Sequence, residues 1–328
     1  MKNGNASNNA GPETMIFIAL STFAGHDPRP LAQLETSKYP FRIHRTGRRI
    51  TTPELLRDGR DATLIIAGIE PYDAATLEAL PALRCIVRCG VGVDSIDLDA
   101  ARSRGIAVLN TPDLPAAAVA ELALTMFLSL SRNLRRQANS MARRQWDRLE
   151  AHMLGGRTVG LIGLGHTGKR VAELCRAFGA RVLASDPFVE PSVARDMGVE
   201  LVPLERLLQT ADIVSLHAAK SAAHPLALGA MELATMKRGA LLVNLARGGM
   251  VDEEALAAAL RSGQLAGAGM DVFTQEPYTG QLCEFENVIL TPHSATLTVE
   301  TRARMELECV EKALRFIDGR VRVEERVV

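Results

Sequence analysis

Two series of short apolar runs, in which each run is followed by a segment with helical spacing, constrain the fold of this chain more than any other feature. Runs this short and this rich in Ile, Val and Leu are typical of buried strands. Strands that alternate with helices form parallel sheets with helices on both faces. The sequence therefore predicts an α/β protein with two doubly wound domains. The predicted strands are Met15–Leu20, Thr63–Ala67, Cys85–Arg88 and Ile106–Leu109, and then Thr158–Ile162, Arg181–Ser185, Asp212–Leu216, Ala240–Leu245, Ala266–Val272 and Asn287–Leu290.

The predicted helices indicate how the two series divide the chain. Thr52–Gly59 and Asp73–Leu80 have helical spacing and end near Gly or Pro. A long helix is predicted from Ala116 to about Arg144, after which the second series of strands begins. A final helix, Val299–Asp318, has no sheet left to join in the second series. We expect it to return to the first domain, which would then be built from both ends of the chain.

The charge and cysteine content argue against several classes of function. Lys and Arg together number 38, as do Asp and Glu, so no net field attracts nucleic acid or an anionic membrane surface. The 5 cysteines include no Cys-x-x-Cys pair, which argues against a disulfide framework or a zinc site and fits a reducing compartment. We expect no metal, no membrane partner and no nucleic-acid partner.

The most polar and the most apolar stretches of the chain indicate the cellular compartment that we expect. Residues 1–14 are polar and lack the apolar run of a signal peptide, so a disordered tail is predicted there. The apolar stretch Ala116–Leu130 is shorter than the ~20 residues that a helix needs to span a bilayer. We therefore expect a cytoplasmic protein.

A glycine-rich loop between a predicted strand and a predicted helix is the strongest local motif. The strand Thr158–Ile162 is followed by Gly163-Leu164-Gly165-His166-Thr167-Gly168 and then by the helical pattern Lys169–Phe178. In this context the first glycine permits a tight turn, the second lets a pyrophosphate approach the backbone, and the third lets the helix pack on the strand. The helix N-terminus also offers unpaired N–H groups to phosphates. The motif predicts a dinucleotide site made by Gly163, Gly165, His166, Thr167 and Gly168, and the simpler alternative is a structural turn.

The choice of dinucleotide depends on Asp186, which ends the next predicted strand. A carboxylate at this position accepts hydrogen bonds from the ribose hydroxyls of adenosine. It also repels a 2′-phosphate, so NAD is favoured over NADP as the cofactor. The simpler alternative is a surface aspartate.

Three residues that suit carbonyl reduction follow later predicted strands. Arg247, Glu276 and His293 each come after the end of a strand, where open α/β sheets bind ligands. An arginine fork binds a carboxylate and polarises the adjacent carbonyl. A histidine exchanges a proton near neutral pH, and a carboxylate beside it favours the imidazolium and fixes its orientation. Each residue alone fits a loop or a solvated surface, whereas the three together indicate an oxidoreductase site.

Arg247, Glu276, His293 and the glycine-rich loop together are typical of a known enzyme family. From about Met15 to Arg320 it resembles the family of D-isomer-specific 2-hydroxyacid dehydrogenases. The resemblance implies a Rossmann NAD-binding domain over residues 113–292 and a discontinuous, flavodoxin-like substrate (catalytic) domain over residues 15–112 and 293–328. Family members are commonly homodimers joined through the cofactor domain. The matching stretches are Gly90-Val91-Gly92-Val93-Asp94, Asn110-Thr111-Pro112, Val119-Ala120-Glu121-Leu122, the glycine-rich loop, and residues 244–252, 271–277 and 291–293.

The resemblance also implies roles for single residues. Arg247 would bind the substrate carboxylate and carbonyl, His293 would be the acid/base, and Glu276 would pair with His293. Asp271 would contact the nicotinamide carboxamide, and His217 and Ala246 would be further cofactor-binding positions.

The substrate carboxylate would be held by the backbone amides of Val91, Gly92 and Val93. This role makes chemical sense because glycine-flanked amides readily form an anion-binding nest.

Within the family the chain looks most like short phosphoglycerate dehydrogenases that lack a C-terminal regulatory domain. Arg88 and Arg148 match basic positions of that subgroup's substrate site. Where the subgroup places a phosphate-binding arginine this chain has Ala67-Gly68, and where it has an asparagine this chain has Leu114-Pro115. The expected substrate is therefore 3-phosphoglycerate/3-phosphohydroxypyruvate or a smaller acid such as hydroxypyruvate or glyoxylate.

Two other functions on the same fold stay open. An NAD-sensing protein similar to the family's corepressors would keep Arg247, Glu276 and His293 without turnover. A phosphite- or formate-type dehydrogenase would oxidise a small anion, although formate enzymes typically carry glutamine where this chain has Glu276. Turnover on a common 2-oxo acid would distinguish a 2-hydroxyacid dehydrogenase from these two alternatives.

Overall fold

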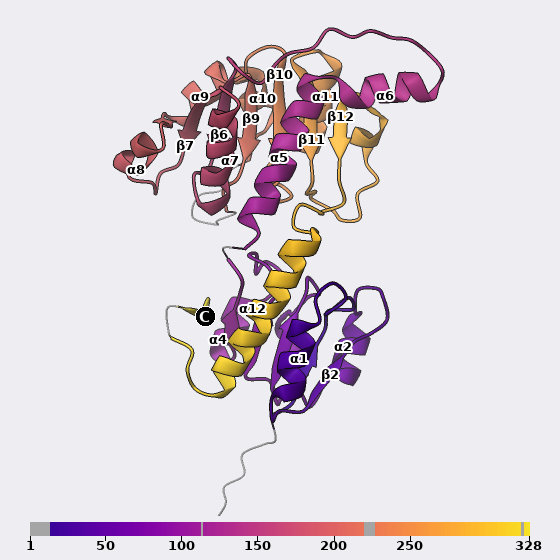
Figure 1. The fold of residues 1–328 in the computed structure, drawn as a ribbon, viewed down its shortest axis with the longest axis vertical. Helices are drawn as coiled ribbons and strands as arrows, with labels where there is room; N and C mark the ends of the chain where they lie inside the picture. Colours follow the sequence, from indigo (N-terminus) through magenta and orange to yellow (C-terminus); the bar gives the residue numbers. More distant parts are fainter. Residues whose placement is uncertain (1–13, 113, 220–226, 323–324) are drawn as a thin grey trace, which may run out of the picture. The chain divides into compact units, whose positions relative to one another are not determined.

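The computed structural model describes residues 14–112, 114–219, 227–322 and 325–328, and the chain divides into two compact units. Unit 1 is Met1–Pro115 with Val299–Val328, and unit 2 is Ala116–Thr298 (Figure 1). The predicted tail, apart from Thr14, and Asp113, the first residue of the predicted NAD-binding domain, lie outside the described residues.

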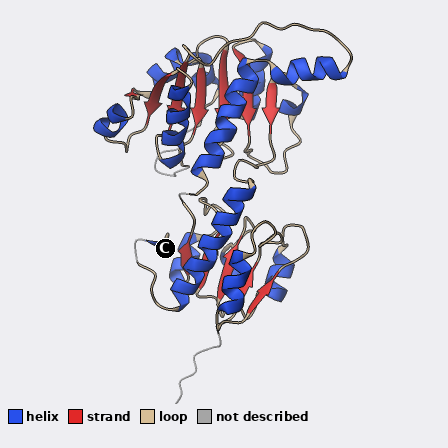
Figure 2. Ribbon diagram, viewed as in Figure 1, coloured by secondary structure: helices blue, strands red, loops and turns tan. Residues whose placement is uncertain are grey.

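Unit 1 is a sheet of five parallel strands in the order β2-β1-β3-β4-β5. Figure 2 shows its helices on both faces of this sheet. Its strands are β1 (Ile16–Ile18), β2 (Phe41–Ile43), β3 (Leu64–Ala67), β4 (Cys85–Arg88) and β5 (Ala107–Leu109). Its helices are α1 (Arg29–Thr36), α2 (Thr52–Asp58), α3 (Ala74–Glu78), α4 (Leu98–Ser103) and α12 (Val299–Ile317).

The two faces of the first sheet have separate cores because successive side chains of a strand point to opposite faces. Ile16 and Ile18 pack with α1 and α12, whereas Phe17 packs with α2, α3 and α4. From α12, Met305 and Cys309 are buried in the first of these cores. α12 therefore belongs to unit 1, which is built from both ends of the chain.

Unit 2 is a sheet of seven parallel strands in the order β12-β11-β10-β9-β6-β7-β8. One face carries α5 and α7, and the other carries α9, α10 and α11. Its strands are β6 (Thr158–Ile162), β7 (Arg181–Ser185), β8 (Glu200–Leu201), β9 (Ile213–Leu216), β10 (Ala240–Asn244), β11 (Leu265–Met270) and β12 (Val288–Leu290). Its helices are α5 (Ala116–Ser131), α6 (Leu134–Ala142), α7 (His166–Ala177), α8 (Pro191–Asp196), α9 (Leu204–Thr210), α10 (Ala230–Thr235), α11 (Glu253–Arg261) and the 3₁₀ helix η1 (Gln281–Glu284).

The predicted helix from Ala116 to about Arg144 is wrong as one helix, because it breaks into α5 and α6. Asn133 stands at the break with φ of +51°, a left-handed conformation that asparagine adopts more readily than most residues. Its side-chain amide donates to the carbonyl of Glu150 at 2.8 Å, which holds the bend.

Two short strands were also not predicted. β2 and β8 lie at sheet edges, and none of their residues is fully buried, so they lack the apolar run that marks a central strand. Among the described residues, no helix combines the length and the apolar content that crossing a bilayer requires.

Candidate active site

The predicted site residues of unit 2, with one exception, follow the carboxyl ends of neighbouring strands. Because all strands of this sheet are parallel, their carboxyl ends lie at one edge, where open α/β sheets bind ligands. This edge therefore gathers residues that are far apart in the sequence. They are the glycine-rich loop after β6, Asp186 after β7, His217 after β9, Ala246 and Arg247 after β10, Asp271 and Glu276 after β11, and His293 after β12.

The glycine-rich loop has the geometry that its motif predicts. Gly163 has φ of +96°, and a Cβ there would lie 2.6 Å from the backbone nitrogen of Ala218. A Cβ on Gly168 would lie 2.2 Å from the carbonyl oxygen of Gly163. A Cβ on Gly165 would meet no atom of the described residues within 4 Å, and Gly165 is the N-cap of α7 without a side-chain acceptor. The loop is thus packed tightly at its ends and open in the middle, where a phosphate would approach the helix N-terminus.

Asp186 is fixed against this loop. Its carboxylate accepts the backbone N–H of Leu164 at 2.7 Å on one oxygen and that of Phe188 at 2.9 Å on the other. The side chain is half-buried, and an ionised carboxylate has capacity for further donors. The position fits a ligand that presents hydroxyl groups.

His217 carries a buried polar atom that has no partner in the part of the chain that the structure describes. Its Nε2 lies 2.9 Å from the hydroxyl of Ser215, whereas Nδ1 is buried and has no hydrogen-bond partner among the described residues. Burial lowers the pKa of His217 to about 4, so the ring is neutral at pH 7. The backbone of His217 lies against Gly163, where a Cβ would come within 2.8 Å of its carbonyl carbon. An orphaned nitrogen beside the glycine-rich loop fits a ligand group or a water.

His293 and Glu276 form the predicted pair. Nδ1 of His293 lies 3.0 Å from Oε2 and 3.2 Å from Oε1 of Glu276. The backbone N–H of Phe273 donates to Oε1 at 3.2 Å, so the carboxylate is held by its own loop. With Nδ1 directed at Glu276, Nε2 is the ring nitrogen left for proton exchange. The pair has the geometry of an acid/base and the carboxylate that orients it.

Asp271 holds the loop that carries His293. Its side chain is 0% exposed and accepts the Thr291 hydroxyl at 2.6 Å and the N–H groups of Ser294 at 2.8 Å and Ala295 at 3.0 Å. Its carbonyl oxygen accepts the N–H of His293 at 2.8 Å. The structure therefore shows Asp271 as a positioning residue for His293. Its contact with the nicotinamide carboxamide stays a prediction.

Asn244 shapes the turn that presents Arg247. Its buried side chain accepts the N–H of Ala246 at 3.0 Å and donates to the carbonyl of Arg247 at 3.0 Å. Sequence reasoning assigned no role to Asn244, although a polar residue that ends an apolar strand signals such a turn. A Cβ on Gly248 would lie 1.8 Å from the carbonyl oxygen of Phe273, so the loops after β10 and β11 are in contact. Arg247 and Glu276 are thus supplied by adjoining loops.

In unit 1, the predicted anion-binding amides follow β4. The carbonyl of Gly90 accepts the N–H of Thr111 at 3.1 Å, and the carbonyl of Val91 accepts the side-chain amide of Asn110 at 2.8 Å. These bonds turn the carbonyls toward Asn110 and Thr111. Within the described part of the chain, the amides of Val91, Gly92 and Val93 have no hydrogen-bond acceptor. Three consecutive amides of this kind are available to an anion, and half-buried Arg88 precedes them. Their role in binding the substrate carboxylate stays a prediction.

Arg148 is the exception, because the structure does not bring it to the other residues of unit 2. The segment between α6 and β6 runs along the amino-terminal edge of the sheet (Figure 1). The N–H of His152 donates to Ser131 at the end of α5, and the N–H of Gly156 donates to Gly179 before β7. Strands of about five residues separate the two edges by roughly 15 Å. Arg148 therefore does not join His293 within one chain.

The chain is similar to known proteins of one family. Residues 124–295 match the family described as D-isomer specific 2-hydroxyacid dehydrogenase, NAD binding domain. A glyoxylate reductase of Korarchaeum cryptofilum is 39% identical over 77% of this chain and 78% of its own. A D-3-phosphoglycerate dehydrogenase of Mycobacterium leprae is 38% identical over 83% of this chain. The chain covers 55% of that relative, and so spans about half the length of several curated relatives that it matches.

The fold has a close match among solved structures. The TT0316 protein of Thermus thermophilus superposes with a TM-score of 0.87 at 34% identity, over 96% of this chain and 100% of the other. Both units, and not the NAD-binding unit alone, are therefore similar to a known protein.

Proposed function

This chain belongs to the family of D-isomer specific 2-hydroxyacid dehydrogenases and carries its NAD-binding domain, and on that premise we propose that it transfers a hydride between NAD(H) and C2 of a small 2-hydroxy or 2-oxo acid. The observation that carries the proposal is the contact of 3.0 Å between His293 and Glu276, at the sheet edge that also bears Arg247 and the glycine-rich loop.

The residues of unit 2 fit the cofactor. The open space at Gly165 and the N-terminus of α7 suit a diphosphate, and the carboxylate of Asp186 suits a ribose with free hydroxyls. The unsatisfied Nδ1 of His217 lies beside the same loop. The chemistry that NADH would supply when bound by these residues is the hydride for C2. The negative charge of Asp186 favours NADH over NADPH, which a comparison of the two Kd values tests.

Side chains of the protein polarise the substrate carbonyl and transfer the proton. Arg247 binds the substrate carboxylate and polarises the carbonyl oxygen at C2. As C2 gains the hydride, Nε2 of His293 gives its proton to that oxygen, which becomes the hydroxyl of the product. Glu276 holds the ring so that Nε2 faces the reaction. In the oxidising direction the same nitrogen accepts the hydroxyl proton.

The test is NADH oxidation against a panel of 2-oxo acids, with His293→Ala as the blank. The panel contains 3-phosphohydroxypyruvate, hydroxypyruvate, glyoxylate, pyruvate and oxaloacetate. The proposal predicts turnover on at least one of them that depends on His293. A protein that binds NADH but turns over none of these acids would instead support the NAD-sensing function, and oxidation of phosphite would support the small-anion dehydrogenase.

A homodimer joined through unit 2 is part of the proposal. The segment around α6 exposes large apolar side chains, with Trp146 at 78% exposure, as groups that pack on a partner often do. The others are Leu134, Met141 and Met153. Trp146→Glu should reduce the sedimenting mass to that of one chain. Phe188→Glu, a control at a comparably exposed aromatic of the same unit, should leave the mass unchanged.

A further inference from the structure

A buried carboxylate borders the predicted substrate loop of unit 1. Glu70 follows β3 and is 2% exposed. Its Oε1 accepts the backbone N–H of Gly68 at 2.8 Å and the hydroxyl of Tyr72 at 2.8 Å. Tyr72 is itself fully buried, so the carboxylate is held from two sides. Buried carboxylates are rare without a structural or functional reason.

The segment that carries Glu70 packs along the loop of anion-binding amides. β3 and β4 are neighbours, and the N–H of Cys89 donates to the carbonyl of Ala67 at 2.9 Å. Further on, the N–H of Tyr72 donates to Ser95 at 2.7 Å, and the N–H of Asp97 donates to Tyr72 at 2.9 Å. A substituent of the substrate that extends from the amides of Val91–Val93 toward β3 therefore approaches Glu70.

Glu70 also occupies the backbone N–H that could otherwise bind an anion at the end of β3. It takes the N–H of Gly68, and its Oε2 would lie 2.7 Å from a Cβ at that position. Burial and the charge of Glu70 raise the pKa of Tyr72 well above its ordinary value, and the positive charge of Arg88 opposes this rise. The carboxylate of Glu70 thus puts a negative charge at the end of β3.

We propose that Glu70 selects the substrate: the pocket accepts 2-oxo acids that carry a single carboxylate and discriminates against those with a second anionic group, such as a phosphate, on C3. The inference rests on the proposed function and adds a substrate class to it. Glu70 is a specificity residue that acts through its charge, because its burial limits screening by water and salt.

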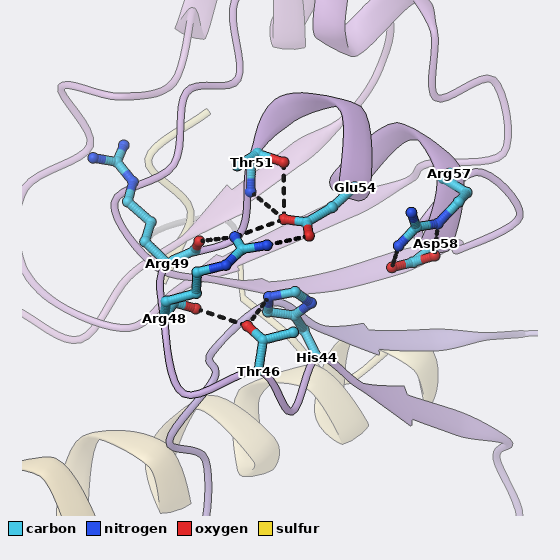
Figure 3. A network of polar contacts seen from close by, with 8 residues as sticks. All are labelled: His44, Thr46, Arg48, Arg49, Thr51, Glu54, Arg57 and Asp58. Carbon is cyan, nitrogen blue, oxygen red and sulfur yellow. Dashed lines mark hydrogen bonds and ion pairs between the residues drawn. The ribbon is translucent and has the colours of Figure 1, made fainter.

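Arg49 is the competing group, because its guanidinium contacts the segment that carries Glu70. Figure 3 shows Arg48 directed at Glu54 and the guanidinium of Arg49 directed away from that network. The guanidinium of Arg49 donates to the carbonyl of Ile69, and no ion pair of Arg49 is found among the described residues. Its side chain is exposed, however, so water and salt weaken its field. The buried charge of Glu70 therefore decides the selectivity.

The experiment compares wild type, Glu70→Gln and Arg49→Gln with two substrates that differ only in a phosphate, hydroxypyruvate and 3-phosphohydroxypyruvate. Glutamine keeps an oxygen that can accept from Gly68 and Tyr72, so the variant removes the charge and retains the contacts. The readout is the ratio of kcat/KM for the phosphorylated substrate to that for the unphosphorylated one. We expect a ratio below one for wild type, a rise of about tenfold in Glu70→Gln, and a change within about twofold in Arg49→Gln.

Three results would overturn the inference. A wild-type preference for the phosphorylated substrate that Arg49→Gln removes would assign the site to Arg49. An unchanged ratio in a folded Glu70→Gln variant would remove Glu70 from selection, and if that variant does not fold, the wild-type ratio still decides. Wild type that reduces no 2-oxo acid at all would refute the proposed function, whereas the first two results leave that function standing.

Discussion

The replacement Asp271→Asn tests whether a buried carboxylate positions His293, the proposed acid/base. Asparagine has nearly the same shape, but one of its two terminal groups donates hydrogen bonds instead of accepting them. In the structure both oxygens of Asp271 accept, from Thr291 and Ser294 on Oδ1 and from Ala295 on Oδ2. The variant therefore retains acceptance on one side and sets its NH₂ group against a backbone N–H on the other.

The expected loss follows from these contacts. One buried, charge-assisted hydrogen bond is replaced by two donors that face each other, which costs about 2 kcal/mol. The bonds that remain on the other oxygen lose the charge of their acceptor, which adds about 1 kcal/mol. We expect the unfolding free energy to fall by about 3 kcal/mol, measured as a shift of the urea midpoint at constant m-value. Because the His293 loop loosens, kcat should fall as well.

A second measurement separates positioning from direct contact with the cofactor. If Asp271 acts through His293, combining Asp271→Asn with His293→Ala should lower kcat no further than His293→Ala alone, and the Kd for NADH should stay within about threefold of wild type. Thr291→Val is the matched control, because it removes the shortest hydrogen bond to the Asp271 carboxylate and leaves the negative charge of Asp271 in place. Wild-type stability and kcat in Asp271→Asn would refute the reasoning. A large loss of NADH affinity would favour the predicted contact with the nicotinamide.

Three further predictions follow from the site. His293→Ala should leave the Kd for NADH unchanged and lower kcat by ~10²-fold or more, the scale of general acid catalysis, so unchanged turnover would remove His293 from the mechanism. Gly165→Ala should keep the wild-type Tm, because its Cβ would meet no atom of the described residues, but it should weaken NADH binding, because that Cβ would occupy the space left for the diphosphate. Gly168→Ala should lower the Tm, because its Cβ would lie 2.2 Å from the carbonyl oxygen of Gly163. Calorimetry and NADH titration distinguish the two variants, and equal effects on Tm and on the Kd for NADH would contradict this account. The folded-state pKa of His217, about 4, lies below its unfolded value of 6.5, so the unfolded chain takes up this proton first and stability should fall as pH decreases from about 6.5 to about 4. His217→Asn should flatten that part of the curve in urea titrations, and an unaltered slope would show that His217 titrates normally.

The central strands and the contact between His293 and Glu276 could be predicted from the sequence because each has a local signal. Buried parallel strands are short, continuous apolar runs, and residues that follow such runs must lie at one edge of the sheet. His293 and Glu276 are therefore placed by two local patterns. The break at Asn133 could not be predicted in this way, since it depends on a hydrogen bond to Glu150 that only the folded chain provides.

The position of Arg148 and the burial of Glu70 could not be predicted from the sequence. Arg148 matches a basic position of the substrate site, yet the course of the chain after α6 puts its segment at the opposite edge of the sheet. Glu70 looks like a solvated loop residue, and only packing reveals that it is buried against Tyr72. Both outcomes depend on tertiary structure, which a pattern of residue types does not encode.

The place of α12 in unit 1 has a consequence for how the protein is made. The ribosome synthesises β1 to β5 first and α12 only after all of unit 2. Met305, Cys309 and Val310 cover Ile16, Ile66 and Val87, so until α12 emerges one face of the first sheet lacks its apolar cover. Domains generally fold as units in the order in which they are synthesised. In this protein unit 2, although encoded later, is complete first, and the nascent first sheet must avoid aggregation until the last helix arrives.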